Sequence, residues 1–206
     1  MGEPPEAPWK SLAPMFLERG YALRILRKRL KLPTPLDTTD REVLERRIIP
    51  QYLRDPGIQR VLFVGCGSYT AHYERTLFSH VSFATIEPDP SQSRYGSSQR
   101  HVIAPLQALS EHFPAGAFDL ILCNGVYGWG LDSREHCEAA FAQCHTCLRA
   151  GGHFLFGWDD VPRRTPTPLA GLASLARFGK YDFPGFGTWR YLTDTPFRHT
   201  YDFYRK

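Results

Sequence analysis

The chain has 206 residues, which is enough for one domain with a sizeable core. Its 42% hydrophobic and 22% charged residues and its net charge of +4 are typical of a globular protein, and no apolar stretch is long enough to cross a membrane. The first residues do not resemble a secretory signal, and five cysteines favour reduced thiols, so we expect a cytoplasmic protein.

The N-terminal part is predicted to be helical. Apolar residues recur at near-helical spacing from Leu12 to Leu30, with basic residues between them. The basic run from Arg24 to Lys31 is typical of a solvated helix face, and the alternative is a nucleic-acid contact. A further helix is expected to open with a capping box at Thr39–Glu42 and to kink or end at Pro50.

A glycine turn follows the first predicted strand. Four apolar residues, Val61 to Val64, end at Gly65-Cys66-Gly67, and a helix-like run extends from Ala71 to Phe78. A short apolar run closed by glycine favours a buried parallel strand, and the glycines let a ligand approach the main chain. An ordinary strand-to-helix turn would have the same pattern.

An acidic residue ends the second predicted strand. Residues 81–86 are apolar and β-branched, and Glu87 follows them, about twenty positions after the glycine turn. Folds that bind nucleosides place a carboxylate there, because it accepts two hydrogen bonds from the ribose hydroxyls. The glycine turn and Glu87 together therefore favour a binding site for a nucleoside-bearing ligand. The alternative is that Glu87 merely begins a polar turn.

Strands and helices continue to alternate beyond Glu87, which predicts a parallel α/β sheet. The expected strands are 101–104, 118–123 and 154–156, and the expected helices are 106–113 and 132–148. Residues 161–186 are rich in proline and glycine and predict an irregular insertion around a short helix at 169–178. Residues 188–192 and 199–204 alternate polar and apolar, which predicts an antiparallel pair at the sheet edge.

Four segments together resemble the class I S-adenosylmethionine-dependent methyltransferases. They are the run 61–67, Glu87, the run 118–126, and Leu148-Arg149-Ala150-Gly151-Gly152-His153-Phe154-Leu155. The resemblance covers residues 58–206. It implies a Rossmann-like, seven-stranded, mostly parallel sheet with helices on both faces and an antiparallel C-terminal strand. It further implies a methyltransferase domain at 58–206, a helical cap at 1–57, and a substrate-side insertion at 161–186.

The resemblance also implies a cofactor, S-adenosyl-L-methionine, which leaves as S-adenosyl-L-homocysteine. The positions expected to bind it are Gly65, Cys66, Gly67, Tyr69, Glu87, Pro88, Gln107, Asn124 and Gly125. The sequence departs from the family pattern at three places: Phe63 stands where an acid is usual, Tyr69 replaces the third glycine, and Pro105-Leu106 replaces the acid that meets adenine. These departures bear on the affinity and the pose of the cofactor.

The acceptor is expected near the ends of the fourth and fifth strands. The candidates for binding it are Tyr127, Trp129, Asp132 and Trp158, and the catalytic candidates are Asn124, Tyr127 and Asp159. Aromatic faces can hold a planar or cationic acceptor, and Asp159 or Asp160 can deprotonate one. The alternatives are ordinary packing for the tryptophans and a solvated turn for the acids.

A small-molecule acceptor is favoured because the chain has no separate recognition domain for RNA or protein. The rivals are a nucleic-acid or protein methyltransferase, an NAD-dependent dehydrogenase, whose last motif glycine is here Thr70, and a noncatalytic nucleoside-binding protein. No metal site is expected, because Cys144 and Cys147 lie within a predicted helix without a second ligand pair.

Overall fold

The structure is a computed structural model, and it describes residues 38–206. The helices expected between residues 12 and 30, and the basic run at 24–31, lie outside the described residues. Within residues 38–206, no helix is long and apolar enough to cross a membrane.

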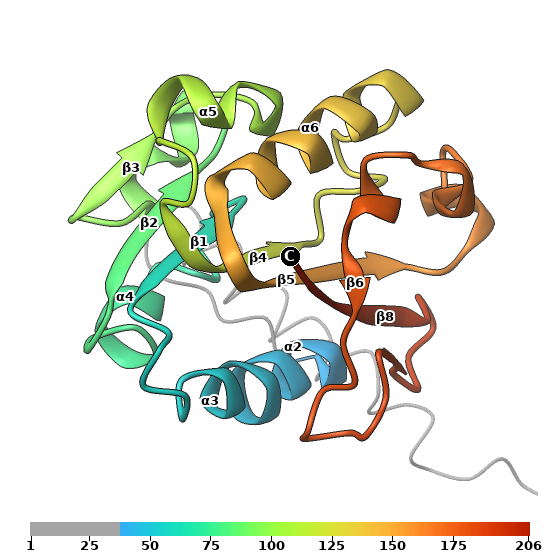
Figure 1. Cartoon of the computed structure of the whole chain (residues 1–206), viewed down its shortest axis with the longest axis horizontal. Coiled ribbons are helices and arrows are strands. Elements are labelled where there is room, and N and C mark those ends of the chain that lie inside the picture. The colour runs from blue at the N-terminus through green and yellow to red at the C-terminus, as the bar shows by residue number, and fades with distance from the viewer. Residues whose placement is uncertain (1–37) are drawn as a thin grey trace, which may run out of the picture.

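One eight-stranded sheet runs through the described part of the chain, in the order β3-β2-β1-β4-β5-β8-β6, with β7 also paired to β8 (Figure 1). Strands β1 to β5 are parallel, and β8 runs antiparallel to β5. The strands are β1 (Arg60–Val64), β2 (Ser82–Ile86), β3 (Arg100–Val102), β4 (Phe118–Asn124), β5 (Leu148–Asp159), β6 (Gly179–Lys180), β7 (Arg190–Leu192) and β8 (His199–Arg205).

This topology confirms the expected fold class and the antiparallel pair formed by β7 and β8. The sheet has eight strands instead of seven, because both short strands, β6 and β7, pair with successive parts of β8. The insertion is largely irregular, as expected. The helix expected at 169–178 is replaced by two 3-10 turns, η6 (Leu169–Gly171) and η7 (Leu175–Arg177).

Helices cover both faces of the sheet (Figure 1). On one face, α6 (Arg134–Cys147) and the short α5 (Leu109–His112) pack on β4 and β5, with Phe141 and Phe154 fully buried between them. On the other face, the helix at residues 39–52 packs on β1 and β8, with Ile48 and Phe203 in that core. Because both faces are covered, β4 is buried along its whole length, which explains its apolar run from Leu120 to Cys123.

The helix at residues 39–52 lacks the expected capping box, and of the two outcomes expected at Pro50, a kink or an end, the end does not occur. It is continuous through α2 (Thr39–Val43), a π-helical segment η2 (Leu44–Ile48) and α3 (Ile49–Tyr52), so Pro50 does not end it. A proline lacks the N–H that an α-helix requires, and the wider π turn just before it accommodates that loss. The N-cap is Thr38 without a side-chain bond, and Glu42 pairs with Arg46, so the expected capping box does not form.

The helix after the glycine turn is also shorter than expected. Only α4 (Tyr73–Thr76) is helical within the run 71–78, and turns occupy the residues before it. A single helical turn has little macrodipole, so the backbone of the turn itself must supply the polar groups for any ligand there.

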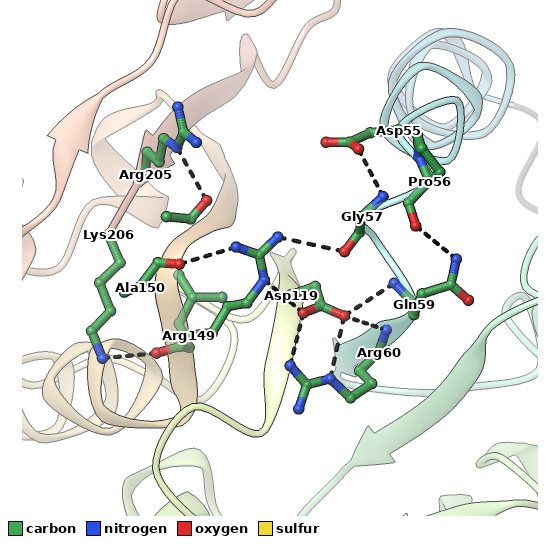
Figure 2. A network of polar contacts seen from close by, with 12 residues as sticks. Asp55, Pro56, Gly57, Gln59, Arg60, Asp119, Arg149, Ala150, Arg205 and Lys206 are labelled. Atoms are coloured by element: carbon green, nitrogen blue, oxygen red, sulfur yellow. Dashed lines mark hydrogen bonds and ion pairs between the residues drawn. The ribbon is translucent and has the colours of Figure 1, made fainter.

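The amino-terminal ends of three strands are joined by Asp119 of β4 (Figure 2). Its carboxylate accepts hydrogen bonds from the backbone N–H of Gln59 and Arg60, from the Arg60 guanidinium at 2.8 Å, and from Nε of Arg149 at 2.7 Å. Burial raises the pKa of Asp119, but the hydrogen bonds from Arg60, Gln59 and Arg149 outweigh it and lower the pKa to about 2. This network holds β1, β4 and β5 together at the end of the sheet opposite the glycine turn.

Candidate functional site

The glycine turn and Glu87 lie side by side because their strands are parallel neighbours in register. Val64 pairs with Ile86, so Gly65 and Glu87 follow at the same edge of the sheet, and the N–H of Gly65 donates to the carbonyl of Ile86 at 2.9 Å. Gly65 has φ +78°, and a Cβ there would come within 3.1 Å of Val126. The positive φ favours glycine at this position, and a side chain there would also crowd Val126.

The backbone fixes both oxygens of the Glu87 carboxylate. Oε2 accepts the N–H of Cys66 at 3.2 Å, and Oε1 accepts the N–H of Asp89 at 2.9 Å. A carboxylate has about four lone-pair sites, so each oxygen can accept one more hydrogen bond. The half-buried carboxylate is therefore held ready for two further donors.

A cavity of about 300 Å³ opens beside this pair. Four of the expected cofactor residues line it, namely Gly65, Glu87, Pro88 and Gln107. Trp129, expected on the acceptor side, lines the same cavity. Its remaining walls are mostly apolar and come from the ends of the strands and the loops after them: Val64, Ile86, Ala104, Pro105, Leu106, Val126, Gly130, Leu131 and His136.

The remaining expected cofactor residues do not line this cavity: Cys66, Gly67, Tyr69, Asn124 and Gly125. Cys66 is buried, and burial raises the pKa of its thiol to about 12, so it is a neutral packing group. Tyr69 lies over Gly67, where a Cβ would come within 2.9 Å of the ring. The Tyr69 ring is itself covered by the guanidinium of Arg41, 4.7 Å from its centroid.

A buried polar chain connects the ends of β4, β5 and β8. His199 Nδ1 lies 2.6 Å from Asp159 Oδ1, and His199 Nε2 lies 3.0 Å from the side-chain oxygen of Asn124. The indole N–H of Trp129 donates to the other oxygen of Asp159 at 3.2 Å. Asn124 and Asp159 are thus brought together, and His199, which the sequence reasoning missed, connects them.

The pKa of Asp159 reflects this pairing. Burial raises it, but the hydrogen bonds from His199 and Trp129 and the charge of Arg164 lower it overall. Asp159 is therefore ionised at neutral pH with both oxygens engaged. The carboxylate is placed to orient His199, which in turn contacts the amide of Asn124.

Two of the expected acceptor residues are at a second, larger cavity of about 740 Å³. Tyr127 is fully buried, and its hydroxyl donates to the carbonyl of Thr167 in the insertion. Trp158 packs edge-on to Tyr127 and donates its N–H to Asp202 at 3.2 Å. Aliphatic and aromatic side chains of the insertion and of β8 form most of the other walls.

The loop between β4 and α6 separates the two cavities. Arg164 of the insertion holds this loop by donating to the carbonyl of Gly128 at 2.9 Å and by stacking 3.2 Å from the centroid of Trp129. Asp132 is exposed near the start of α6 and lines neither cavity. The expected acceptor residues therefore do not form one cluster.

Residues 62–156 match the model of a family described as "Methyltransferase domain". This segment is therefore similar to a methyltransferase domain. The matched residues begin in β1, end in β5, and include the glycine turn, Glu87 and the whole wall of the smaller cavity. No curated protein sequence matches the chain significantly.

Solved structures of methyltransferases share this fold. The N-methyltransferase NodS from Bradyrhizobium japonicum WM9, also solved with S-adenosylhomocysteine, is 16% identical with a TM-score of 0.60 and covers 83% of this chain and 99% of its own. A SAM-dependent methyltransferase from Archaeoglobus fulgidus is 12% identical, with a TM-score of 0.55 and coverages of 81% and 94%. The expected cofactor, S-adenosylmethionine, is thus the one named for these structural relatives.

A third similar structure contains both a small molecule and the demethylated cofactor. It is the 1,6-didemethyltoxoflavin-N1-methyltransferase from Burkholderia thailandensis, with 16% identity, a TM-score of 0.52 and coverages of 100% and 93%. Within residues 38–206, no group of three or more histidine, cysteine or acidic side chains is arranged to hold a metal ion. Cys144 and Cys147 are buried in α6.

Proposed function

We propose that this chain is an S-adenosylmethionine-dependent methyltransferase that acts on a small-molecule acceptor. The observation that carries the proposal is the juxtaposition of the Gly65–Gly67 turn and Glu87 at one wall of the 300 Å³ cavity. Glu87 has lone pairs for two ribose hydroxyls, Gly65 lets the ligand approach the main chain, and the apolar walls suit an adenine ring.

The described residues fit the needs of methyl transfer. S-adenosylmethionine, when bound, supplies a methyl group on a positively charged sulfur. The transfer is an in-line displacement, so the protein contributes mainly by positioning the acceptor and by excluding water. Asn124 lies where β4 ends beside the glycine turn, and the Asp159–His199 pair fixes its amide there.

The larger cavity supports a small-molecule acceptor. It is lined by Trp158, Tyr204 and Trp189, and the insertion closes one side of it. This arrangement supports the predicted role of residues 161–186 as the substrate-side segment. The Burkholderia enzyme, which has a similar fold, binds both a small molecule and S-adenosylhomocysteine.

The test of the cofactor site is calorimetric titration of the Glu87→Ala variant with S-adenosylhomocysteine. Losing charge-assisted hydrogen bonds to the ribose should weaken binding by roughly 10- to 150-fold, because such bonds contribute about 1.5–3 kcal/mol. The matched control is Glu111→Ala, which removes an exposed carboxylate that lines neither cavity. Equal affinity in the wild type and both variants would contradict the proposed role of Glu87.

Production of S-adenosylhomocysteine from S-adenosylmethionine separates an enzyme from a noncatalytic binder. A panel of small hydroxyl-, amine- and thiol-bearing compounds should include acceptors that accelerate this conversion. Acceleration by RNA or protein alone would instead favour the alternative acceptor classes.

A further inference from the structure

Arg41 of α2 is a buried cation without a carboxylate partner in the described part of the chain. The residue is 7% exposed, and its Nη1 donates to the hydroxyl of Tyr73 at 2.8 Å. Its Nε is buried and has no hydrogen-bond partner among residues 38–206. Glu45 is the acid connected to it, but only through Tyr73, whose hydroxyl donates to Glu45 at 2.6 Å.

This environment favours an anion as a further partner. A guanidinium stays charged in proteins, and burying an ion without a counter-ion is unfavourable by several kcal/mol. A phenol shares one hydrogen bond with Arg41 but carries no charge at neutral pH. The planar fork of arginine is suited to a carboxylate, which can accept two parallel hydrogen bonds.

The position of Arg41 shows which ligand group could reach it. Its guanidinium lies 4.7 Å from the ring centroid of Tyr69, and that ring lies against Gly67 of the glycine turn. Gly65 and Glu87 line the 300 Å³ cavity, whereas Gly67 and Tyr69 do not. The part of a ligand that extends from the nucleoside cavity along the turn toward Gly67 therefore approaches Tyr69 and Arg41.

S-adenosylmethionine has a carboxylate at the end of its chain that is remote from the adenine. We propose that Arg41, packed on Tyr69, forms an anion site for this methionine carboxylate, an inference that rests on the proposed function. The helix at residues 39–52 then contributes directly to the cofactor site, and Tyr73 and Glu45 hold the guanidinium in place.

The test compares S-adenosylmethionine with its decarboxylated analogue, which retains the adenosine, the sulfonium and the amine. Calorimetry on the wild type should show roughly 10- to 100-fold tighter binding of the carboxylated compound, as expected for a charge-assisted hydrogen bond. In Arg41→Met this difference should fall to a few-fold, because only the carboxylated compound loses a partner. Arg41→Lys, which keeps the charge, should restore part of the difference.

Arg46→Gln is the matched control, because Arg46 is on the same helix with its side chain 78% exposed and paired with Glu42. It should preserve the full wild-type difference. Equal binding of both compounds by the wild type would overturn the anion site. A loss of both compounds by the same factor in Arg41→Met would also overturn it, and would assign Arg41 a purely structural role. Failure of the wild type to bind either compound would instead refute the proposed function itself.

Discussion

Gly157 of β5 makes the contact between Asn124 and His199 possible. A Cβ at this position would lie 1.8 Å from the side-chain oxygen of Asn124 and 3.1 Å from Nε2 of His199. The first distance is far below any van der Waals contact, so the Asn124 amide must move if residue 157 carries a side chain. The contact between Asn124 and His199 therefore depends on Gly157, although glycine has no functional side chain.

We predict that Gly157→Ala destabilises the protein by about 1–3 kcal/mol, the usual effect of overpacking a buried site. Chemical denaturation measures this change. Gly179→Ala in β6 is the matched control, because its Cβ would meet the nearest atom, the carbonyl oxygen of Arg205, at an ordinary 3.7 Å. Identical unfolding free energies for the two variants would show that Asn124 is not held as the structure indicates.

At the residue scale, the sequence predicted separate candidates but not their connection. Asn124 and Asp159 were expected because they end strands at the ligand edge of the sheet. His199 was missed because its place opposite Asp159 depends on the register of β8 against β5. The alternating pattern of 199–204 predicts a strand but not its register, and a histidine in such a strand has no distinctive spacing.

Among the elements, β1, β4 and β5 are coupled by the Asp119 network at their amino-terminal ends (Figure 2). The folded-state pKa of Asp119 is about 2, below the usual value of 3.8. A carboxylate with a depressed pKa stabilises the fold above its usual pKa, and this contribution is lost as the pH falls through the folded-state value.

We therefore predict that Asp119→Asn destabilises the protein by about 1–2 kcal/mol near neutral pH, because it removes the charge that both arginines bind, while their partly exposed guanidinium groups remain solvated. The difference from the wild type should shrink as the pH falls from about 4 to about 2. Urea denaturation at several pH values measures it, with the exposed Asp194→Asn as control. A difference that does not change with pH would contradict the assigned role of the charge.

Elements with long, unambiguous patterns were predicted well from sequence. Helix α6 and strand β4 lie close to their expected bounds. The apolar residues of α6 face the core on one side of the sheet, and β4 is buried on both of its faces. The short α4 was not predicted, and at Pro50, where a kink or an end was expected, the helix continues. In both cases tertiary packing overrides the local signal: turns replace helix at 70–72, and a π segment accommodates the proline.

In the molecule as a whole, the cavities of about 300 Å³ and 740 Å³ lie on either side of the loop 125–131. The smaller cavity has the glycine turn and Glu87, and the larger one has the aromatic side chains of β5, β8 and the insertion. Arg164 joins the insertion to the loop at Gly128 and Trp129. The sequence predicts that β1, β2 and β4 are parallel, and their pairing brings Gly65 and Glu87, two of the expected cofactor residues, together. The proposed acceptor side depends on an irregular segment whose path has no sequence signature.

The central claim is that the glycine turn and Glu87 bind an adenosyl sulfonium cofactor. Calorimetric titration of the full-length wild-type protein with S-adenosylmethionine, and separately with NAD, tests it most directly. We predict saturable binding of one S-adenosylmethionine per chain and no heat with NAD. Binding of NAD without S-adenosylmethionine, or of neither compound, would contradict the account.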